Sequence, residues 1–498
     1  MTAELEHTRE TKLSGLLLIT LLLITVLGAL LRIYKLGSDS IWLDEAYSIQ
    51  ISHKSLPEIV EETSKDVHPP LYYFALHYWI KLFGDSEFYA RLLSALFGTL
   101  AIPAIYFVGA LLFEHATGLL ASLLLALSPF NIAFSQEARM YTLFILLALL
   151  SIYFFIKVLE SRSPFALAAY VLSSALLLYT HVYSLFVIIA QNLYWLSLLF
   201  ISRETFKRTW KRWLLAQTLV FLLFLPWLSI LVQQVSHVQK GFWIPRPMAR
   251  TILDTFVTYA GSNELAWILF PLVGLAIFLG LRGRSENVEG EAALSEKQDS
   301  ALSRRLKIHL LLLWLLCPLI LPFIISQFST PIFQTKYTIA ASLAFIILAA
   351  RGLLGVRFHQ LRMLLVLLLL CFSLADLRNY YGAIKKDMWR ESVARFEQLA
   401  EPGDLVLFND RSGQTPFDYY LKRTDVVEKG FPDYESELRA DNLAELLRPA
   451  IEGHDRVWLV ISHPGINSPL IAEQLARSHT TAAQINYPGV EIYLFEKK

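Results

Sequence analysis

Long apolar runs alternate with short polar connections over about the first three quarters of the chain. A helix that crosses about 30 Å of hydrocarbon needs about 20 apolar residues at 1.5 Å each. By this criterion the sequence predicts about eleven membrane-spanning helices, so that the two termini would lie on opposite sides of the membrane. Their approximate ranges are 13–33, 87–112, 116–135, 138–158, 164–180, 182–202, 212–235, 264–282, 307–326, 337–355 and 358–375.

The pattern changes after Asp376, where short strand-like runs alternate with amphipathic helical ones. This alternation predicts a small α/β domain. We therefore expect a membrane domain over residues 1–375, with a first external loop at 34–87, and a soluble domain over residues 376–498. A Gly-rich phosphate loop is missing from the soluble part, so nucleotide binding has no support. The expected helices are 385–399, 443–451 and 470–477, and the expected strands are 404–408, 457–461 and 491–495.

Composition agrees with a polytopic membrane protein, because 55% of the residues are hydrophobic and only 17% are charged. The net charge is only +1, and the basic residues are spread among short loops and form no single patch. Both observations argue against nucleic acid as a partner. Cys317 and Cys371 both lie within apolar runs, which argues against a disulfide framework or a thiolate metal site.

Basic residues in three short connections predict the orientation of the chain. They gather within residues 203–212, 282–307 and 351–362. With the N-terminus inside, all three connections face the cytoplasm, as the positive-inside rule requires. The loop 34–87 and the C-terminal domain then lie outside. We therefore expect a multi-pass protein of the cell membrane whose chemistry takes place on the extracytoplasmic side.

Two adjacent carboxylates, Asp44 and Glu45, follow the first apolar helix and are flanked by Trp42 and Tyr47. Neighbouring side chains differ by about 100° on a helix and point to opposite faces of a strand, so the two acids need not share one task. One can act on a substrate while the other orients it. The alternative is that they only solvate a loop at the membrane surface.

His68 lies farther along the same loop, before two prolines that restrict its backbone. It can belong to a capped turn, contact a substrate, or bind a divalent metal ion together with Glu45 or Asp66. The aromatic segment 69–83 is too short to span a membrane. It predicts an interfacial helix with its aromatic residues at the water–lipid boundary. These aromatic residues are Tyr72, Tyr73, Tyr78 and Trp79.

The segment from Ser135 to Tyr141 connects the third and fourth predicted spans on the outer side. If Ser135 caps the fourth helix, Arg139 stands near a helix N-terminus, where an anion is favoured. Glu137 lies two positions from Arg139 and does not face it on a helix, so the guanidinium is left for a phosphate. Lys336, before a late span, can supply a second phosphate contact.

The sequence gives less specific predictions for two further residues, Arg91 and His181. Arg91 lies about one turn inside the second predicted span, so we expect it to pair with a carboxylate or a lipid phosphate. His181 lies in an outer turn, where we expect a hydrogen-bonded or interfacial histidine.

Four short motifs together resemble the GT-C membrane glycosyltransferases of the protein O-mannosyltransferase and aminoarabinose transferase type. They are Trp42–Glu45, His68–Tyr73, Ser86–Phe88 leading to Arg91, and Ser135–Tyr141. The resemblance covers about residues 1–200 and extends to Lys336 and Tyr337.

The resemblance implies a hexosyl- or pentosyltransferase that takes its sugar from a polyprenyl-phosphate donor, with inversion at the anomeric carbon. Asp44 would activate the acceptor and Glu45 would be its companion. The substrate and donor-phosphate residues would be Arg139, Lys336, His68, Arg91, Tyr141 and Glu137. The acceptor would be an extracytoplasmic protein, lipid or cell-envelope glycan, and the other partners would be membrane lipids.

The residue types suit this chemistry independently of the resemblance. A base must take the proton of the acceptor hydroxyl, and cations must stabilise the charge that grows on the leaving phosphate. A flippase for polyprenyl-linked sugars is the alternative, although it would require ionisable residues deep within several spans. A sensor whose tail domain binds a ligand is a third reading, but it leaves Asp44 and Arg139 unexplained.

Overall fold

The computed structural model describes residues 2–239, 244–282, 291–383, 385–431, 442–462 and 467–498. Contacts group the chain into two compact units. The first, here the membrane unit, comprises residues 1–34, 55–78 and 91–382, and the second, here the soluble unit, comprises residues 35–54, 79–90 and 383–498.

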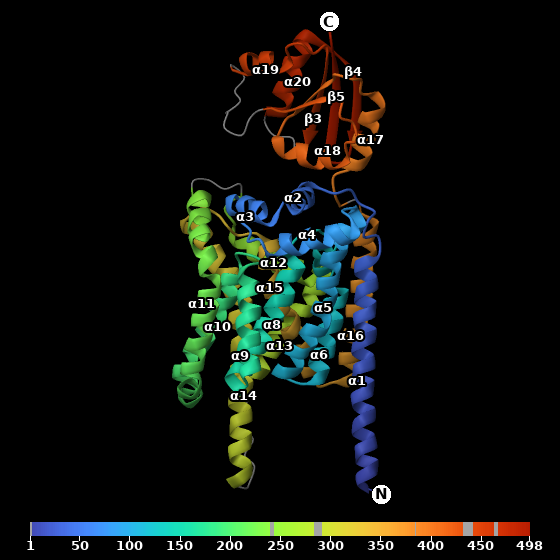
Figure 1. The fold of residues 1–498 in the computed structure, drawn as a ribbon. Helices are drawn as coiled ribbons and strands as arrows, with labels where there is room; N and C mark the ends of the chain where they lie inside the picture. Colours follow the sequence, from blue (N-terminus) through green and yellow to red (C-terminus); the bar gives the residue numbers. More distant parts are fainter. Residues whose placement is uncertain (1, 240–243, 283–290, 384, 432–441, 463–466) are drawn as a thin grey trace. The chain divides into compact units, whose positions relative to one another are not determined.

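Helices dominate the membrane unit (Figure 1). Within the described residues, nine helices are long and apolar enough to cross a membrane, and a bent pair would make ten. All eleven predicted segments are helical, but 116–135 is this bent pair, and 164–180 is the shorter apolar helix α9 (Pro164–Leu178). The nine are α1 (Thr2–Ile33), α5 (Glu87–Leu112), α8 (Tyr141–Glu160), α10 (Ser184–Ile201), α11 (Arg203–Gln239), α13 (Asn263–Arg282), α14 (Glu291–Phe328), α15 (Ile339–Gly355) and α16 (His359–Gly382).

The bent pair consists of α6 (His115–Leu127) and α7 (Pro129–Ser135), which meet at 62°. Ser128 and Pro129 explain the break. Proline cannot donate a backbone hydrogen bond and suits the first position of a helix, and the Ser128 hydroxyl accepts a hydrogen bond from the Asn131 N–H at 3.4 Å. The chain therefore starts a new helix here.

The core of the membrane unit lies around α8 and α15. The apolar windows that contain these two helices are 78% and 83% buried, against 17% for α1 and α16 at the periphery. Close packing requires a small residue on α15, because a Cβ atom at Gly352 would lie 1.8 Å from the Leu272 carbonyl oxygen of α13.

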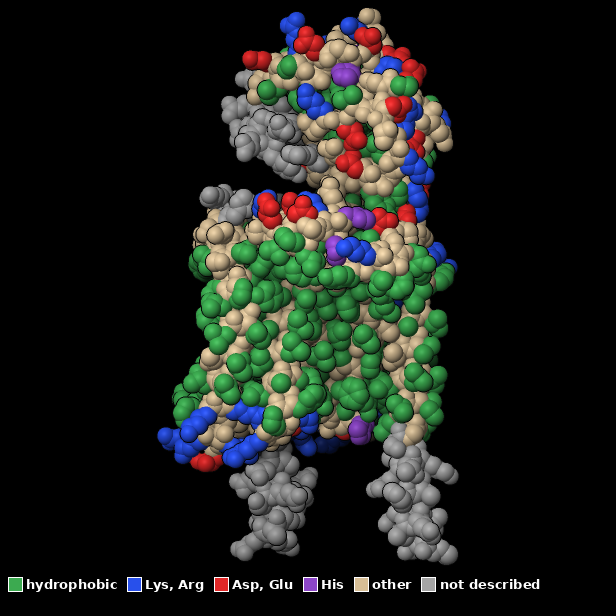
Figure 2. Space-filling model, viewed as in Figure 1, with side chains coloured by type: hydrophobic (Ala, Val, Ile, Leu, Met, Phe, Trp, Pro, Cys, Tyr) green, Lys and Arg blue, Asp and Glu red, His purple; other side chains and the backbone are tan. Residues whose placement is uncertain are grey.

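The described parts of the predicted basic connections lie at one end of the membrane unit, where Figure 2 shows Lys and Arg below the hydrophobic surface. Three contacts fix side chains at this end. Arg351 pairs with Glu114 at 2.8 Å, His309 hydrogen-bonds Ser197 at 3.0 Å, and Arg212 donates to the carbonyls of Ser161 and Ser163. Short helices lie in the connections, namely α3 (Leu56–Lys65), α4 (Leu71–Phe83), which runs on into residues of the soluble unit, α12 (Ala249–Ala260) and the 3₁₀ turn η1 (Thr335–Thr338).

The soluble unit contains a five-stranded sheet in the order β2-β1-β3-β5-β4. The strands β2, β1 and β3 are parallel, whereas β5 runs antiparallel to β3 and β4. The strands are β1 (Leu405–Phe408), β2 (Val427–Gly430), β3 (Arg456–Ser462), β4 (His479–Tyr487) and β5 (Val490–Lys497).

Helices cover both faces of this sheet. Along β1, Val406 and Phe408 pack in one core cluster while Leu405 and Leu407 pack in the other, as the alternation of side chains along a strand requires. Residues of α17 (Trp389–Leu399) and α18 (Gln414–Tyr420) complete the first cluster, and residues of α19 (Leu443–Ile451) and α20 (Asn467–Ser478) complete the second. Figure 1 shows α19 and α20 away from α17.

The predicted α/β character of the C-terminal region is confirmed, although four described elements were not predicted. All six expected elements are present, but the 3₁₀ turn η2 (Arg411–Gly413), α18, β2 and β4 are additional. Residues 35–54 and 79–87 of the predicted first external loop also belong to this unit. The helix α2 (Leu43–Ser52) lies in the first of them.

Candidate active site

Four aromatic rings meet within the membrane unit and form what we call the histidine cluster: His68, Tyr141, His181 and Tyr337. The His181 ring centroid lies 4.8 Å from that of His68, 5.2 Å from that of Tyr337 and 5.9 Å from that of Tyr141. All four residues are buried. The cluster joins residues from four connections that are far apart in the sequence.

Local contacts hold the two histidines in place. Before His68, Gln234 of α11 donates to the carbonyls of Thr63 at 2.9 Å and Asp66 at 2.6 Å. The Tyr183 N–H donates to His181 Nδ1 at 3.1 Å. The His68 Nδ1 and His181 Nε2 atoms are buried without a hydrogen-bond partner in the described part of the chain. A buried polar atom of this kind costs free energy unless a partner, such as a substrate, supplies the bond.

Two cations act on these imidazoles. Burial, and then the positive charges of Arg139 and Lys336, lower the pKa of His181 to about 3. Burial, His181 and the same two cations hold the pKa of His68 well below its usual value. Both imidazoles are therefore neutral near pH 7, and each retains one N–H that can donate to an anion. The predicted phosphate residues Arg139 and Lys336 thus act on a common site.

Arg139 reaches the cluster from a turn and not from a helix. Its backbone N–H donates to the Glu137 carbonyl at 2.8 Å, and its own carbonyl accepts from Ser94 at 3.1 Å. Its Nη1 donates to the Tyr73 hydroxyl at 3.5 Å. The expectation that Ser135 caps the following helix is wrong. Ser135 ends α7 and donates to the Asn131 carbonyl at 2.7 Å, because the chain turns once more before α8 begins at Tyr141.

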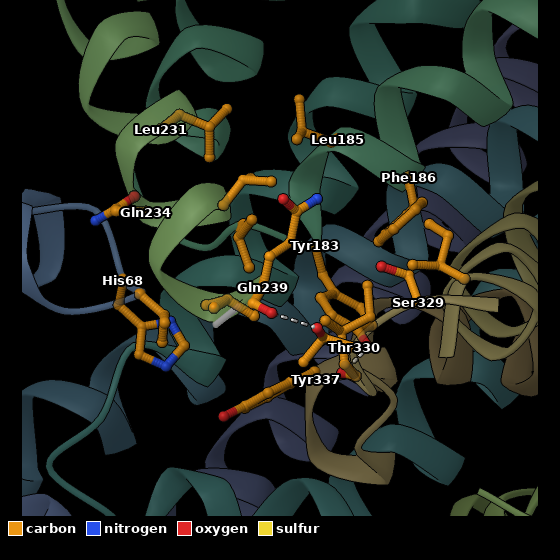
Figure 3. A pocket seen from close by; sticks show the side chains of 16 residues that line it. His68, Tyr183, Leu185, Phe186, Leu231, Gln234, Gln239, Ser329, Thr330 and Tyr337 are labelled. Carbon is orange, nitrogen blue, oxygen red and sulfur yellow. Dashed lines mark hydrogen bonds between the residues drawn. The ribbon is translucent and has the colours of Figure 1, made fainter. Parts of the chain in front are cut away.

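An apolar cavity of about 260 Å³ adjoins the cluster. His68, Tyr183 and Tyr337 line it together with apolar residues of α10, α11 and α14. In Figure 3, His68 and Tyr337 lie at one side of this space, and Leu185 and Leu231 lie at the other. The site therefore combines a polar, cationic part with an apolar chamber.

Asp44 and Glu45 lie in the soluble unit, in the first turn of α2, where acidic residues are favoured by the helix dipole. They face different surroundings. Glu45 is fully buried and accepts from Lys386 at 2.8 Å, whereas Asp44 is half-buried. This difference agrees with the expectation that the two acids have separate tasks.

Further contacts within the soluble unit fix the segment before α2. Ser40 donates to Glu391 at 3.0 Å, and the Ile41 N–H donates to the Tyr420 hydroxyl at 2.7 Å. Tyr420 in turn donates to Glu87 at 3.0 Å. Residues far along the chain thus position the loop that carries Asp44.

The remaining predicted site residues have varied surroundings. Arg91 is 1% exposed on α5, one turn before Ser94, and Glu137 is half-buried in the turn before Arg139. The expectation that Tyr72 and Tyr73 lie at the water–lipid boundary is wrong. Both are fully buried, because Tyr72 hydrogen-bonds Ser94 at 2.8 Å and Tyr73 accepts from Arg139.

The sequence prediction missed three features of the site. His181 is not an interfacial residue, since it is fully buried at the centre of the cluster. Tyr337 was noted only as part of a motif, and Lys386 was not noted at all. A fixed motif spacing could not have identified Lys386, because its partner Glu45 is 341 residues away.

One protein-family profile and several solved structures are similar to this chain. Residues 67–230, about a third of the chain, match the sequence profile of the dolichyl-phosphate-mannose-protein mannosyltransferase family. No curated protein sequence matches the chain.

Several solved structures share the fold. The apo structure of ArnT from Cupriavidus metallidurans is 14% identical with a TM-score of 0.60, and the similarity covers 98% of each chain. The same protein bound to undecaprenyl phosphate is 13% identical with a TM-score of 0.61, over 95% of this chain and 97% of that one.

A third structure is the archaeal oligosaccharyltransferase AglB from Archaeoglobus fulgidus in complex with an inhibitory peptide and a dolichol-phosphate. It is 11% identical with a TM-score of 0.54, over 96% of this chain and 74% of that one. The predicted GT-C resemblance is therefore confirmed: the chain has the fold of these membrane proteins, and its residues 67–230 are similar to the protein mannosyltransferase family.

Proposed function

We propose that this protein is an inverting membrane glycosyltransferase that moves one sugar from a polyprenyl-phosphate donor to an extracytoplasmic acceptor. The observation that carries the proposal is the histidine cluster. There, two cations and two neutral imidazoles adjoin an apolar cavity. An amphipathic site of this kind suits a phosphate attached to an isoprenoid.

The donor phosphate would bind Arg139 and Lys336 and accept N–H hydrogen bonds from His68 and His181. Charge-assisted hydrogen bonds from a guanidinium to phosphate oxygens are among the strongest in proteins. The isoprenoid units next to the phosphate would occupy the apolar cavity of about 260 Å³. The structures of ArnT with undecaprenyl phosphate and of AglB with dolichol-phosphate support a lipid phosphate as ligand.

The transfer itself needs one base and the two cations. Asp44 would accept the proton of the acceptor hydroxyl while the hydroxyl oxygen forms a bond to the anomeric carbon. The bond between that carbon and the phosphate oxygen breaks on the opposite face, so the configuration inverts. Its electrons leave on the polyprenyl phosphate, where Arg139 and Lys336 stabilise the added charge. Phosphate is a good leaving group, so a general acid is not needed.

The acceptor would be a protein, lipid or cell-envelope glycan on the outer side of the membrane. The basic connections support this side, because they gather at one end of the membrane unit and would face the cytoplasm. The Archaeoglobus fulgidus oligosaccharyltransferase has also been solved tethered to an acceptor peptide, which supports a protein as one candidate acceptor.

A divalent ion at Glu45 and His68 stays a prediction. Within the described residues, no group of three or more His, Cys, Asp or Glu residues is placed to hold a metal ion. Glu45 already accepts from Lys386 at 2.8 Å, so this pair would have to separate before Glu45 could bind a metal. Assays with and without a chelator, followed by addition of single divalent cations, would measure any dependence.

The proposed transfer is tested with the full chain reconstituted in sealed vesicles that contain a polyprenyl phosphate carrying a labelled sugar. Mass spectrometry of the lipid that copurifies would identify the sugar to use. We expect the label to leave the isoprenoid fraction and to appear in a glycosidic bond to an added membrane acceptor. Movement of the labelled head group across the bilayer without bond formation would instead favour the flippase.

A further inference from the structure

A second cavity lies at the other end of the membrane unit. The helix α8 begins with Tyr141 in the histidine cluster and ends with Glu160, which lines this cavity. Its length of 20 residues, at 1.5 Å each, separates the two places by about 30 Å. The second cavity is therefore distinct from the candidate active site, and the inference below does not depend on the proposed function.

This cavity has about 320 Å³ and an amphipathic lining. Its polar side carries Arg208, Lys307 and the hydroxyls of Ser202 and Thr205. Leucines of α5, α8, α10 and α14 form the apolar side, which comprises Leu111, Leu112, Leu159, Leu198, Leu306 and Leu310. A ligand that fills it must have an anionic or hydroxylated head next to a hydrocarbon.

The charges in the cavity favour an anion. Arg208 and Lys307 have no hydrogen bond or salt bridge to any residue that the structure describes. Glu160 is the carboxylate of the lining, and it pairs with Lys157 at 3.6 Å. Four charges act electrostatically on Lys307, namely the carboxylates of Glu160 and Glu114 and the guanidinium groups of Arg304 and Arg351. The lining thus holds two cations against one carboxylate, and this excess of positive charge favours an anionic ligand.

We propose that this cavity binds the head group of an anionic membrane phospholipid. The phosphate contacts Arg208 and Lys307, the glycerol or head-group hydroxyls reach Ser202 and Thr205, and the first acyl carbons follow the leucines. Basic pockets between transmembrane helices are suited to anionic lipids. The neighbouring outer surface is apolar, with Leu199 39% exposed and Phe200 87% exposed, so the acyl chains continue into the bilayer. A free phosphate would leave the leucine wall unfilled.

Native mass spectrometry of the delipidated full chain, with phosphatidylglycerol or phosphatidylcholine added, tests this proposal. The variant Arg208→Gln/Lys307→Gln is compared with Lys207→Gln/Lys211→Gln, which removes two charges of the same basic connection outside the lining. We expect the first variant to lose about 30-fold in phosphatidylglycerol affinity, at roughly five-fold for each lost cation. The second variant should bind as the wild type does, and phosphatidylcholine should bind weakly to all three.

The single variant Arg208→Gln keeps the test valid if the double variant does not fold, because Arg208 is exposed. It should lose about five-fold in affinity. Equal losses in both double variants would overturn the proposal, since they would indicate only diffuse attraction. Equal binding of phosphatidylcholine, displacement of the lipid by inorganic phosphate, or preference for polyprenyl phosphate would also overturn it.

Discussion

Two buried histidines of the membrane unit, His68 and His181, have lowered pKa values and are neutral near pH 7. His68 and His181 are in ring contact, and Arg139 and Lys336 act on both of them. A protonated imidazole at this place would repel both cations and lose its hydration. A neutral imidazole instead adds a hydrogen-bond donor for an anionic ligand without adding repulsion. At the residue scale, these charges are therefore compatible with the proposed phosphate ligand.

This arrangement predicts a loss of stability in acid. The pKa of His181 lies at about 3 in the folded protein and near 6.5 in the unfolded chain. The unfolded chain therefore binds more protons between these values, and the free energy of unfolding falls as the pH falls below about 6.5. The slope is about 1.4 kcal/mol per pH unit for each such histidine. Thermal unfolding in detergent at a series of pH values measures this slope.

The variant His181→Asn isolates the contribution of this histidine to the slope. It should flatten the dependence of the unfolding temperature on pH below 6.5, whatever its stability at neutral pH. An unchanged slope would show that folding does not lower the pKa of His181.

Arg139 should matter for transfer far more than an exposed arginine does. Replacing Arg139 by Gln removes a cation from the developing phosphate charge, which should lower the transfer rate by about 10²–10³-fold. Arg250→Gln is the matched control, because the Arg250 side chain is 81% exposed on α12. Initial rates with a labelled lipid donor measure both variants. Comparable rates for the two variants would remove Arg139 from the site.

At the scale of elements, the position of α2 depends on a contact with the segment that leads into the C-terminal domain. The Glu45–Lys386 pair is buried, with side-chain exposures of 0% and 10%. Removing one partner of a buried pair leaves an uncompensated charge, whereas removing both can be nearly neutral. Glu45 is therefore best explained as the residue that orients α2, and thus Asp44.

Single and double variants of this pair test that role. Glu45→Gln and Lys386→Met should each destabilise the protein by on the order of 3 kcal/mol, and the double variant should lose less than their sum. Glu61→Gln is the control, because the Glu61–Lys65 pair is 65% and 61% exposed and should contribute less than about 1 kcal/mol. Additive losses in unfolding experiments would mean that the pair does not form.

The contact between α13 and α15 gives a second prediction at this scale. A methyl group at Gly352 would meet the Leu272 carbonyl oxygen at 1.8 Å, and backbone cannot yield as a side chain can. Gly352→Ala should therefore cost about 1–3 kcal/mol or more. Gly274→Ala in α13 should be tolerated, because nothing lies within 4 Å of the added atom. Thermal unfolding of the two purified variants compares them, and equal unfolding temperatures would contradict this packing.

Across the whole molecule, the sequence predicts helices and strands better than it predicts which distant residues contact one another. Hydropathy depends only on neighbouring residues, so it predicted all eleven apolar segments as helices. The bend between α6 and α7 was not predicted, because a hydropathy average does not take account of the proline after Ser128. Short elements such as β2 escaped prediction, since four residues carry little periodicity.

The same distinction holds for the candidate site. Asp44, His68, Arg139 and Lys336 were predicted because they lie in polar outer connections and in motifs that resemble GT-C glycosyltransferases. Their surroundings could not be predicted. The ring contacts of His181 and the ion pair of Lys386 depend on which distant connections meet, and that depends on the packing of the whole unit.

The most direct test of the proposed glycosyl transfer is the rate of sugar transfer by Asp44→Asn in reconstituted vesicles, beside the wild type and Glu61→Gln. Loss of a general base should lower the rate by about 10²–10⁴-fold. The amount of copurifying polyprenyl lipid should stay the same, since the donor is bound by other residues. Glu61→Gln should transfer as the wild type does. Transfer by Asp44→Asn at the wild-type rate would contradict the proposed mechanism.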